Sequence, residues 1–175
     1  MRALFSIALF AMLSTIQGCG QTKSTNTVKN KQNQASSDIA ILPYNSSLHW
    51  IFKDAQNADL GTKELNEIET LFKRCIADYN VKAEEQYQKL KQEHPGSKFE
   101  KSQIVLDLNR YKRQYVAVIN TKGEKEVWIN CFCNTWEKDW KKEIVIVMDG
   151  GNCYFNLKIN LAKQTSYEMS VNGEA

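Results

Sequence analysis

The sequence lacks the motifs that would point to a particular chemistry. It contains no glycine-rich phosphate loop, no Gly-x-Ser-x-Gly nucleophile motif and no His-Glu-x-x-His zinc motif. Histidine, the most common proton-transfer residue, occurs only at His49 and His94. Asp149 precedes a Gly-Gly turn, and Glu124 and Glu126 flank a predicted hairpin, so local structure explains these acids. The sequence therefore predicts no catalytic residues, no cofactor and no metal site.

The expected folded part of the chain also lacks a charge imbalance. The full sequence has a formal net charge of +3. Four of its 23 Lys and Arg residues and one of its 20 Asp and Glu residues precede Ile39, which leaves 19 of each sign in the remainder. A neutral domain has no electrostatic footprint for nucleic acid, so we expect no nucleic-acid partner.

The N-terminal residues carry an export pattern. Arg2 precedes an apolar stretch over residues 3–16, which is too short to span a bilayer core of about 30 Å. The stretch runs into Ile16-Gln17-Gly18-Cys19, which resembles the lipobox of bacterial lipoproteins. The resemblance implies that residues 1–18 are a signal peptide, that Cys19 is lipidated and that Gly20 directs the protein to the outer membrane. An ordinary secretory signal followed by an unrelated cysteine is the alternative.

A polar segment separates Cys19 from the rest of the chain. Between Gly20 and Asp38 the only aliphatic residues are Val28 and Ala35, which cannot bury enough apolar surface to offset the entropy of ordering. We therefore expect a flexible tether. The chain divides into a signal peptide (1–18), a lipidated cysteine with its tether (19–38) and a single domain (39–175), which the lipid attaches to the membrane of the cell envelope.

Periodicity predicts helix at the start of the domain. Over residues 62–80, apolar residues recur at three- and four-residue spacing, with Thr62 as the N-terminal cap and Asn80 as the C-terminal stop. Residues 81–93 form a weaker second helix or an extension of the first, which His94-Pro95-Gly96 ends. The preceding residues 39–52 are irregular but aromatic, which predicts an arm packed against the domain.

From residue 103 the hydrophobic period changes from 3.6 to 2, which predicts strands. Turn residues place hairpins at 121–124 and 149–151. The expected strands are 104–108, 114–120, 126–133, 144–148, 152–161 and 166–171. Residues 153–161 alternate between an apolar and a polar face, as is typical of an antiparallel sheet covered on one side. The predicted fold is α+β, with an N-terminal helix packed on a four- to five-stranded antiparallel sheet.

This order of a helix followed by four antiparallel strands resembles the cystatin-like and NTF2-like α+β folds. In style, the runs at 111–120, 125–133 and 150–155 resemble the small lipoproteins of Gram-negative bacteria. The second resemblance implies a lipid-anchored protein of the cell envelope. Neither resemblance implies a particular activity.

The domain contains four cysteines, whose arrangement leaves two interpretations open. They are Cys75, Cys131, Cys133 and Cys153. Buried free thiols and one or two structural disulfides both fit an oxidising envelope. Cys131 and Cys133 point to the same face of one strand, so either can reach Cys75 or Cys153 but they are not expected to pair with each other. Their Cys-x-Cys spacing does not match a zinc knuckle.

Aromatic and amide residues supply the candidate contact surface. Trp136 and Trp140 flank a polar loop, where exposed tryptophan commonly anchors an interface. A second set lies on the sheet face opposite the cysteines and comprises Trp128, Asn130, Phe132, Tyr154, Asn156, Lys158 and Asn160. Such a surface suits an envelope protein, a peptide or a glycan. In the alternative arrangement the tryptophans pack on the sheet, and the 39–52 arm or the 81–93 helix covers the second set.

We therefore expect a lipid-anchored, non-enzymatic binding module, of which an inhibitor or immunity-type protein is one form. An enzyme with an NTF2-like cleft and a purely structural envelope lipoprotein are the alternatives. A deep pocket with two convergent titratable groups would favour the enzyme, whereas a filled core with an exposed aromatic patch would favour binding.

Overall fold

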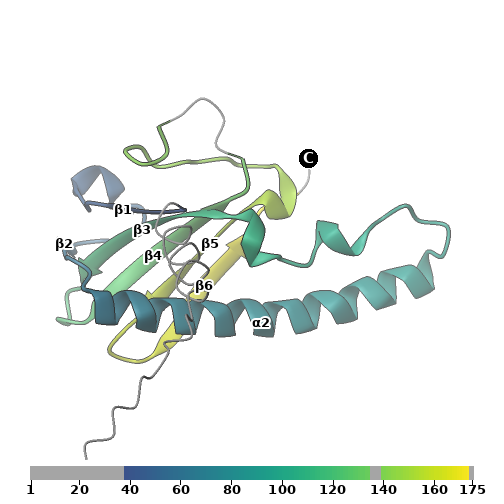
Figure 1. Ribbon diagram of the computed structural model, residues 1–175, viewed down its shortest axis with the longest axis horizontal. Helices are drawn as coiled ribbons and strands as arrows, with labels where there is room; N and C mark the ends of the chain where they lie inside the picture. Colours follow the sequence, from purple (N-terminus) through teal and green to yellow (C-terminus); the bar gives the residue numbers. More distant parts are fainter. Residues whose placement is uncertain (1–37, 135–138, 174–175) are drawn as a thin grey trace, which may run out of the picture.

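The computed structural model describes residues 38–134 and 139–173 and has the predicted α+β architecture. A long helix lies along one face of a twisted sheet, and irregular segments lie along the other (Figure 1). The strands and the helix are β1 (Ile39–Leu42), β2 (Gln56–Asn57), α2 (Thr62–Glu93), β3 (Lys112–Ile119), β4 (Lys125–Phe132), β5 (Tyr154–Asn160) and β6 (Thr165–Val171). The single-turn 3-10 helices are η1 (Ser46–Leu48), η2 (Lys101–Gln103), η3 (Leu108–Arg110) and η4 (Gly151–Cys153).

The sheet has six strands and is mixed, which corrects the expectation of a four- to five-stranded antiparallel sheet. Its order is β1-β3-β4-β5-β6, and β2 also pairs with β3. Strands β3 to β6 form an antiparallel meander. The predicted hairpin joins β3 to β4, and Gly123 has the positive φ of 77° that its turn requires. The difference comes from the arm, because residues 39–42 form β1 and run parallel to β3.

The helix α2 is one continuous element, so residues 81–93 extend the predicted first helix. Thr62 is its first residue rather than its cap. Gly61 occupies the N-cap position, and its amide donates to the Glu64 carboxylate at 2.8 Å. The helix ends at His94, as predicted. Because α2 carries charged residues along its whole length, no helix of the described residues has the apolar length needed to cross a membrane.

Asn80 lies within α2 and does not end it. Its side chain bonds the amide and the carbonyl of Leu106, each at 2.8 Å. The Asn152 side chain donates to the carbonyls of Ser102 and Val105 at 2.8 and 3.3 Å. Residues 104–108 therefore do not form the predicted strand, because side-chain amides satisfy backbone groups that a strand would pair with a neighbour.

The helix packs on a core that fills the space between α2 and the sheet. Phe72 of α2 and Phe155 of β5 stack with ring centroids 6.3 Å apart. The other fully buried members include Ile68, Ile76, Ile129, Leu157 and Ile159. Burial of each such side chain stabilises the fold by about 1.5–3 kcal/mol. The predicted apolar faces of α2 and of β5 both lie in this core.

The opposite face of the sheet is covered by the 39–52 arm and by residues 139–150. The arm contributes Leu48, Ile51 and Phe52, all of which are buried against the sheet. The arm thus packs against the domain, as expected. The sheet therefore has an apolar core on each face. This corrects the expectation of a sheet that is covered on one side only.

Residues 144–148 do not form the predicted strand either, although Gly150 and Gly151 make a turn with φ of 86° and 59°. A side chain at position 150 would meet the ring of Tyr154, since an added Cβ would lie 2.7 Å from it. The turn leads into η4 instead of closing a hairpin. Asn172 of the C-terminal segment donates to the carbonyl of Val147 at 2.7 Å and fixes this segment from the side.

The completely buried amide of Gln114 ties this loop to the centre of the sheet. Its nitrogen donates to the carbonyls of Trp140 and Glu143, each at 2.6 Å. Its oxygen accepts from the Val145 amide at 3.0 Å and from the Asn130 side chain at 3.1 Å. One side chain thus satisfies the backbone of a loop that has no strand partner.

We expect Gln114→Ala to lower the free energy of unfolding by about 2–4 kcal/mol, since it leaves several buried polar groups without partners. Urea unfolding followed by tryptophan fluorescence measures this loss. Gln88→Ala, at an exposed position on α2, is the matched control and should stay within about 0.5 kcal/mol of the wild type. Equal effects of the two substitutions would contradict the structural role assigned to Gln114.

Candidate functional site

Most of the aromatic residues predicted to form an open surface are internal. Trp128, Phe132 and Tyr154 belong to the core beneath the arm, and Trp140 packs edge-on against Phe132 with centroids 5.8 Å apart. Each is less than 10% exposed. This corrects the expectation of an open aromatic face, because the arm and the 139–150 loop cover it. Trp136 lies outside the described residues.

Four of the predicted contact residues nevertheless line a shared cleft of about 180 Å³. They are Trp128, Asn130, Tyr154 and Asn156. Three large apolar side chains at the cleft are exposed to solvent: Trp50 at 51%, Ile146 at 54% and Met148 at 89%. Trp50 meets Trp128 edge-on at 5.6 Å. We call this concavity the Trp50 cleft.

The amides of the Trp50 cleft are used inside the protein. Asn130 donates to the Val145 carbonyl at 2.7 Å, and Asn172 donates to the carbonyls of Val147 and Asp149. Asn156 accepts from the Trp128 indole at 3.3 Å. What the cleft offers a partner is therefore mainly apolar surface at Trp50, Ile146 and Met148. Sequence analysis did not single out these three residues as contacts, since periodicity placed Ile146 and Met148 on a strand that does not form.

A disulfide joins Cys133, which directly follows β4, to Cys153, the last residue of η4. Cys131 and Cys75 are free thiols. Cys131 is completely buried, and desolvation raises the pKa of its thiol well above the ordinary range. Cys75 lies 3.7 Å from the sulfur of Met169 and is partly buried. The structure thus combines both interpretations of the cysteine pattern, and the buried thiol is not activated as a nucleophile.

The paired carboxylates Glu124 and Glu126 are held in a hydrogen-bonded network. Glu124 accepts from Lys163 at 2.9 Å, from Asn160 at 2.8 Å and from Asn120 at 3.3 Å. Asn160 also donates to Glu126 at 2.9 Å. The bonds from Lys163, Asn160 and Asn120 lower the pKa of Glu124 to about 2. A carboxylate this acidic stays ionised at neutral pH. Its hydrogen bonds link the β3–β4 turn to the β5–β6 connection, which is a structural role rather than proton transfer.

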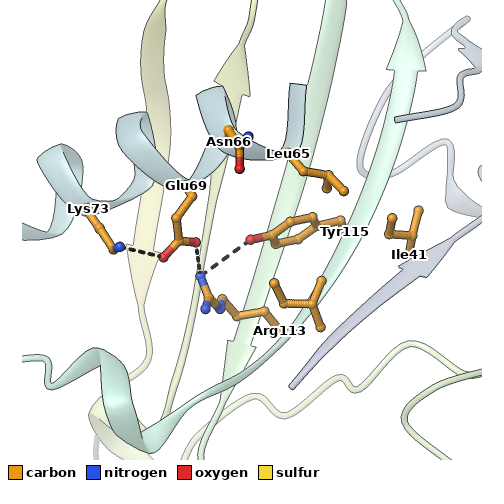
Figure 2. Close-up of a pocket in the computed structure, with 8 residues that line it drawn as sticks. Ile41, Leu65, Asn66, Glu69, Lys73, Arg113 and Tyr115 are labelled. Carbon is orange, nitrogen blue, oxygen red and sulfur yellow. Dashed lines mark hydrogen bonds and ion pairs between the residues drawn. The ribbon is translucent and has the colours of Figure 1, made fainter. Parts of the chain in front are cut away.

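A second concavity of about 410 Å³ lies between α2 and the edge of the sheet. Figure 2 shows Glu69 and Lys73 on α2, Arg113 and Tyr115 on β3, and Ile41 on β1 arranged around it. Arg113 donates to Glu69 at 2.6 Å, and Lys73 pairs with the other oxygen of Glu69 at 3.1 Å. We call this the β1–α2 groove. Sequence analysis did not single out any of its residues.

The Glu69 carboxylate and the Tyr115 hydroxyl of the β1–α2 groove keep their ordinary charge states at neutral pH. Burial opposes the charge of Glu69, but the charges and hydrogen bonds of Arg113 and Lys73 outweigh it and lower the pKa of Glu69. Burial raises the pKa of Tyr115, which stays neutral. The Arg113 guanidinium lies 5.2 Å from the centre of the Phe72 ring. Such a set binds charge but holds no group poised to give up or accept a proton near neutral pH.

Nothing in the described residues brings together three His, Cys, Asp or Glu side chains in an arrangement that could hold a metal ion. Comparisons with protein-family models, with curated proteins and with solved structures gave no significant match. The two concavities described above differ in chemistry. One is an apolar cleft with a tryptophan rim, and the other is an edge groove with an ion-paired wall.

The Glu124 network predicts a specific loss of stability in acid. Because the folded-state pKa is about 2 and the unfolded value is about 4.3, the stabilisation is complete above about pH 5 and is lost as the pH falls toward about 2. Urea unfolding of Glu124→Gln should therefore show a weaker pH dependence than the wild type across this range. Glu85→Gln, at an exposed position on α2, is the control and should leave the wild-type dependence intact. An unchanged profile in Glu124→Gln would refute the role of the network.

Proposed function

We propose that this protein is a non-enzymatic binding module whose partner contacts the Trp50 cleft. The observation that carries the proposal is the exposure of three large apolar side chains, Trp50, Ile146 and Met148, around one concavity on a domain whose core is otherwise filled. Exposed aromatic and methionine side chains are typical anchors of protein interfaces. The cleft amides are bonded internally, so an apolar protein surface fits the cleft better than a glycan does.

The setting of this module is the cell envelope. The lipobox-like sequence around Cys19 supports a lipid anchor, and the polar residues after it support a tether that holds the domain a few nanometres from the membrane. The Cys133–Cys153 disulfide agrees with an oxidising compartment. An outer-membrane location is the form that Gly20 favours.

The arrangement of α2 followed by the β3–β6 meander supports a cystatin-like rather than an NTF2-like fold, since α2 packs on a filled core and the groove beside it lies at the edge of the sheet. A small module of this form that presents an apolar cleft could act by occupying the surface of one partner. An inhibitor or immunity-type protein is the specific form of binding module that we propose.

The contact claim is testable by photo-crosslinking in cells. A benzophenone amino acid at position 148 should give a discrete higher-mass adduct, and Trp50→Ala in the same chain should reduce its yield several-fold, because the tryptophan anchor is lost. The matched control places the photoprobe at Lys63, whose side chain is 90% exposed on α2, and should give no adduct of that mass. Equal yields with and without Trp50 would exclude the cleft as the contact surface.

The anchor is tested separately. Radiolabelled palmitate should be incorporated into the wild-type chain and not into Cys19→Ser, which should move from the membrane to the soluble fraction. Cys75→Ser is the control, and it should retain both the label and the membrane association. A Cys19→Ser chain that remained with the membrane would contradict the lipid anchor without affecting the contact claim.

A further inference from the structure

The outer edge of β1 has backbone groups directed away from the sheet. The Asp38 carbonyl accepts from the Arg113 amide at 2.8 Å. Since backbone groups alternate in direction along a strand, Ala40 and Leu42 face β3, whereas the amides and carbonyls of Ile39 and Ile41 face outward. No described strand pairs with this edge. It is a template for one more strand.

The two edges of the sheet differ in how they are protected. In β6 the pairing with β5 shifts between Asn156 and Lys158, and Glu168 within this shift has a φ of 49°. Such a bulge bends an edge and disfavours addition of another strand. The sequence of β1, Ile-Ala-Ile-Leu, contains no charge, no proline and no bulge. Strand addition is therefore favoured at β1.

The residues with outward backbone groups also line the β1–α2 groove. Ile39 and Ile41 form part of its wall, and Ile41 is 48% exposed. A strand added beside β1 would place every second side chain over this groove. The part of the groove next to β1 is apolar, because Ile39 and Ile41 line it. A side chain of the added strand that points into the groove would therefore contact these isoleucines first and the charged residues beyond them.

The charged wall of the groove has an excess of one positive charge. Its charged lining residues are Lys73, Arg113 and Glu69, so two cations face one carboxylate. The Arg113 Nε is buried and has no hydrogen-bond partner among the described residues. Tyr115 contributes a hydroxyl 3.5 Å from Arg113 and no charge. An acidic side chain is the complement of this wall.

We propose that the outer edge of β1 and the adjoining groove bind an extended peptide, which adds as a further strand and directs an acidic side chain toward Lys73 and Arg113. Backbone hydrogen bonds to Ile39 and Ile41 supply the general affinity, and the groove supplies the preference for acid. The site is separate from the Trp50 cleft and does not depend on the function proposed for it.

The test uses the purified full chain and three blocked nonapeptides of alternating threonine and valine, with glutamate, glutamine or lysine at the centre. Fluorescence anisotropy should show that the glutamate peptide binds about three- to fivefold more tightly than the glutamine peptide, as expected for one partly exposed ion pair. The lysine peptide should bind most weakly. Failure of all three peptides to bind, or equal binding by all three, overturns the proposal.

Two variants separate the backbone contribution from the charge. Ile41→Pro removes an outward amide but leaves the β1–β3 hydrogen bonds intact. It should abolish binding of every peptide, while the midpoint of unfolding in urea changes little. Lys73→Gln should keep binding but reduce the preference for glutamate toward unity. Lys63→Gln, also on α2 but outside the groove, should retain the wild-type preference. Peptide binding that survives Ile41→Pro refutes strand addition.

Two other occupants of the edge give distinct results. A dimer in sedimentation equilibrium that dissociates in Ile41→Pro would identify a second copy of the chain as the occupant. Octanoate that binds the wild type and Ile41→Pro equally, when none of the peptides binds, would identify a ligand that needs only a carboxylate and an apolar tail. Either result overturns the assignment to a peptide, and neither changes the crosslinking result at position 148.

Discussion

The buried amide of Gln114 is the interaction on which the architecture of the outer face depends. Strands β3 and β4 carry buried side chains on both faces, so both faces need cover. On one face the cover is α2, whose backbone groups are hydrogen-bonded within the helix. On the other face the cover is irregular chain, whose amides and carbonyls have to find partners inside the protein. Gln114 and Asn130 present those partners from the middle of the sheet, and the 139–150 loop takes its position from them.

The predictable parts of the fold are those in which the signal is local. The apolar stripe of α2, the alternation along β5 and the turn at Gly123 each depend on residues within one element, and the structure has all three. Strand β1 was not predictable, because four residues of apolar sequence do not reveal a parallel partner more than seventy positions away. Tertiary pairing decided its conformation.

The expectation of an open aromatic face was wrong for the same reason, because tertiary contacts decide which side chains are covered. Asn130, Asn156 and Lys158 alternate with apolar residues, which is the pattern of a solvated face. Asn130 instead bonds the Val145 carbonyl, and Lys158 lies 4.9 Å from the centre of the Phe52 ring and pairs with Glu168. Whether an amide or a lysine faces water or a loop backbone depends on a segment elsewhere in the chain. For the same reason Trp50, Ile146 and Met148, the exposed residues of the cleft, were found only in the structure.

The Cys133–Cys153 bridge makes the order of the outer face depend on the oxidation state of two cysteines. The residues between the two cysteines include three backbone partners of Gln114, at Trp140, Glu143 and Val145, as well as Ile146 and Met148. The bridge therefore closes one covalent ring that carries part of the rim of the Trp50 cleft. While the thiols are reduced, that ring is open, and its ordering depends on the hydrogen bonds to Gln114 and on the packing of Trp140 and Val145 in the core. Oxidation restricts the open ensemble and favours the formed rim. A chain with reduced thiols would therefore present a less ordered Trp50 cleft than the oxidised chain.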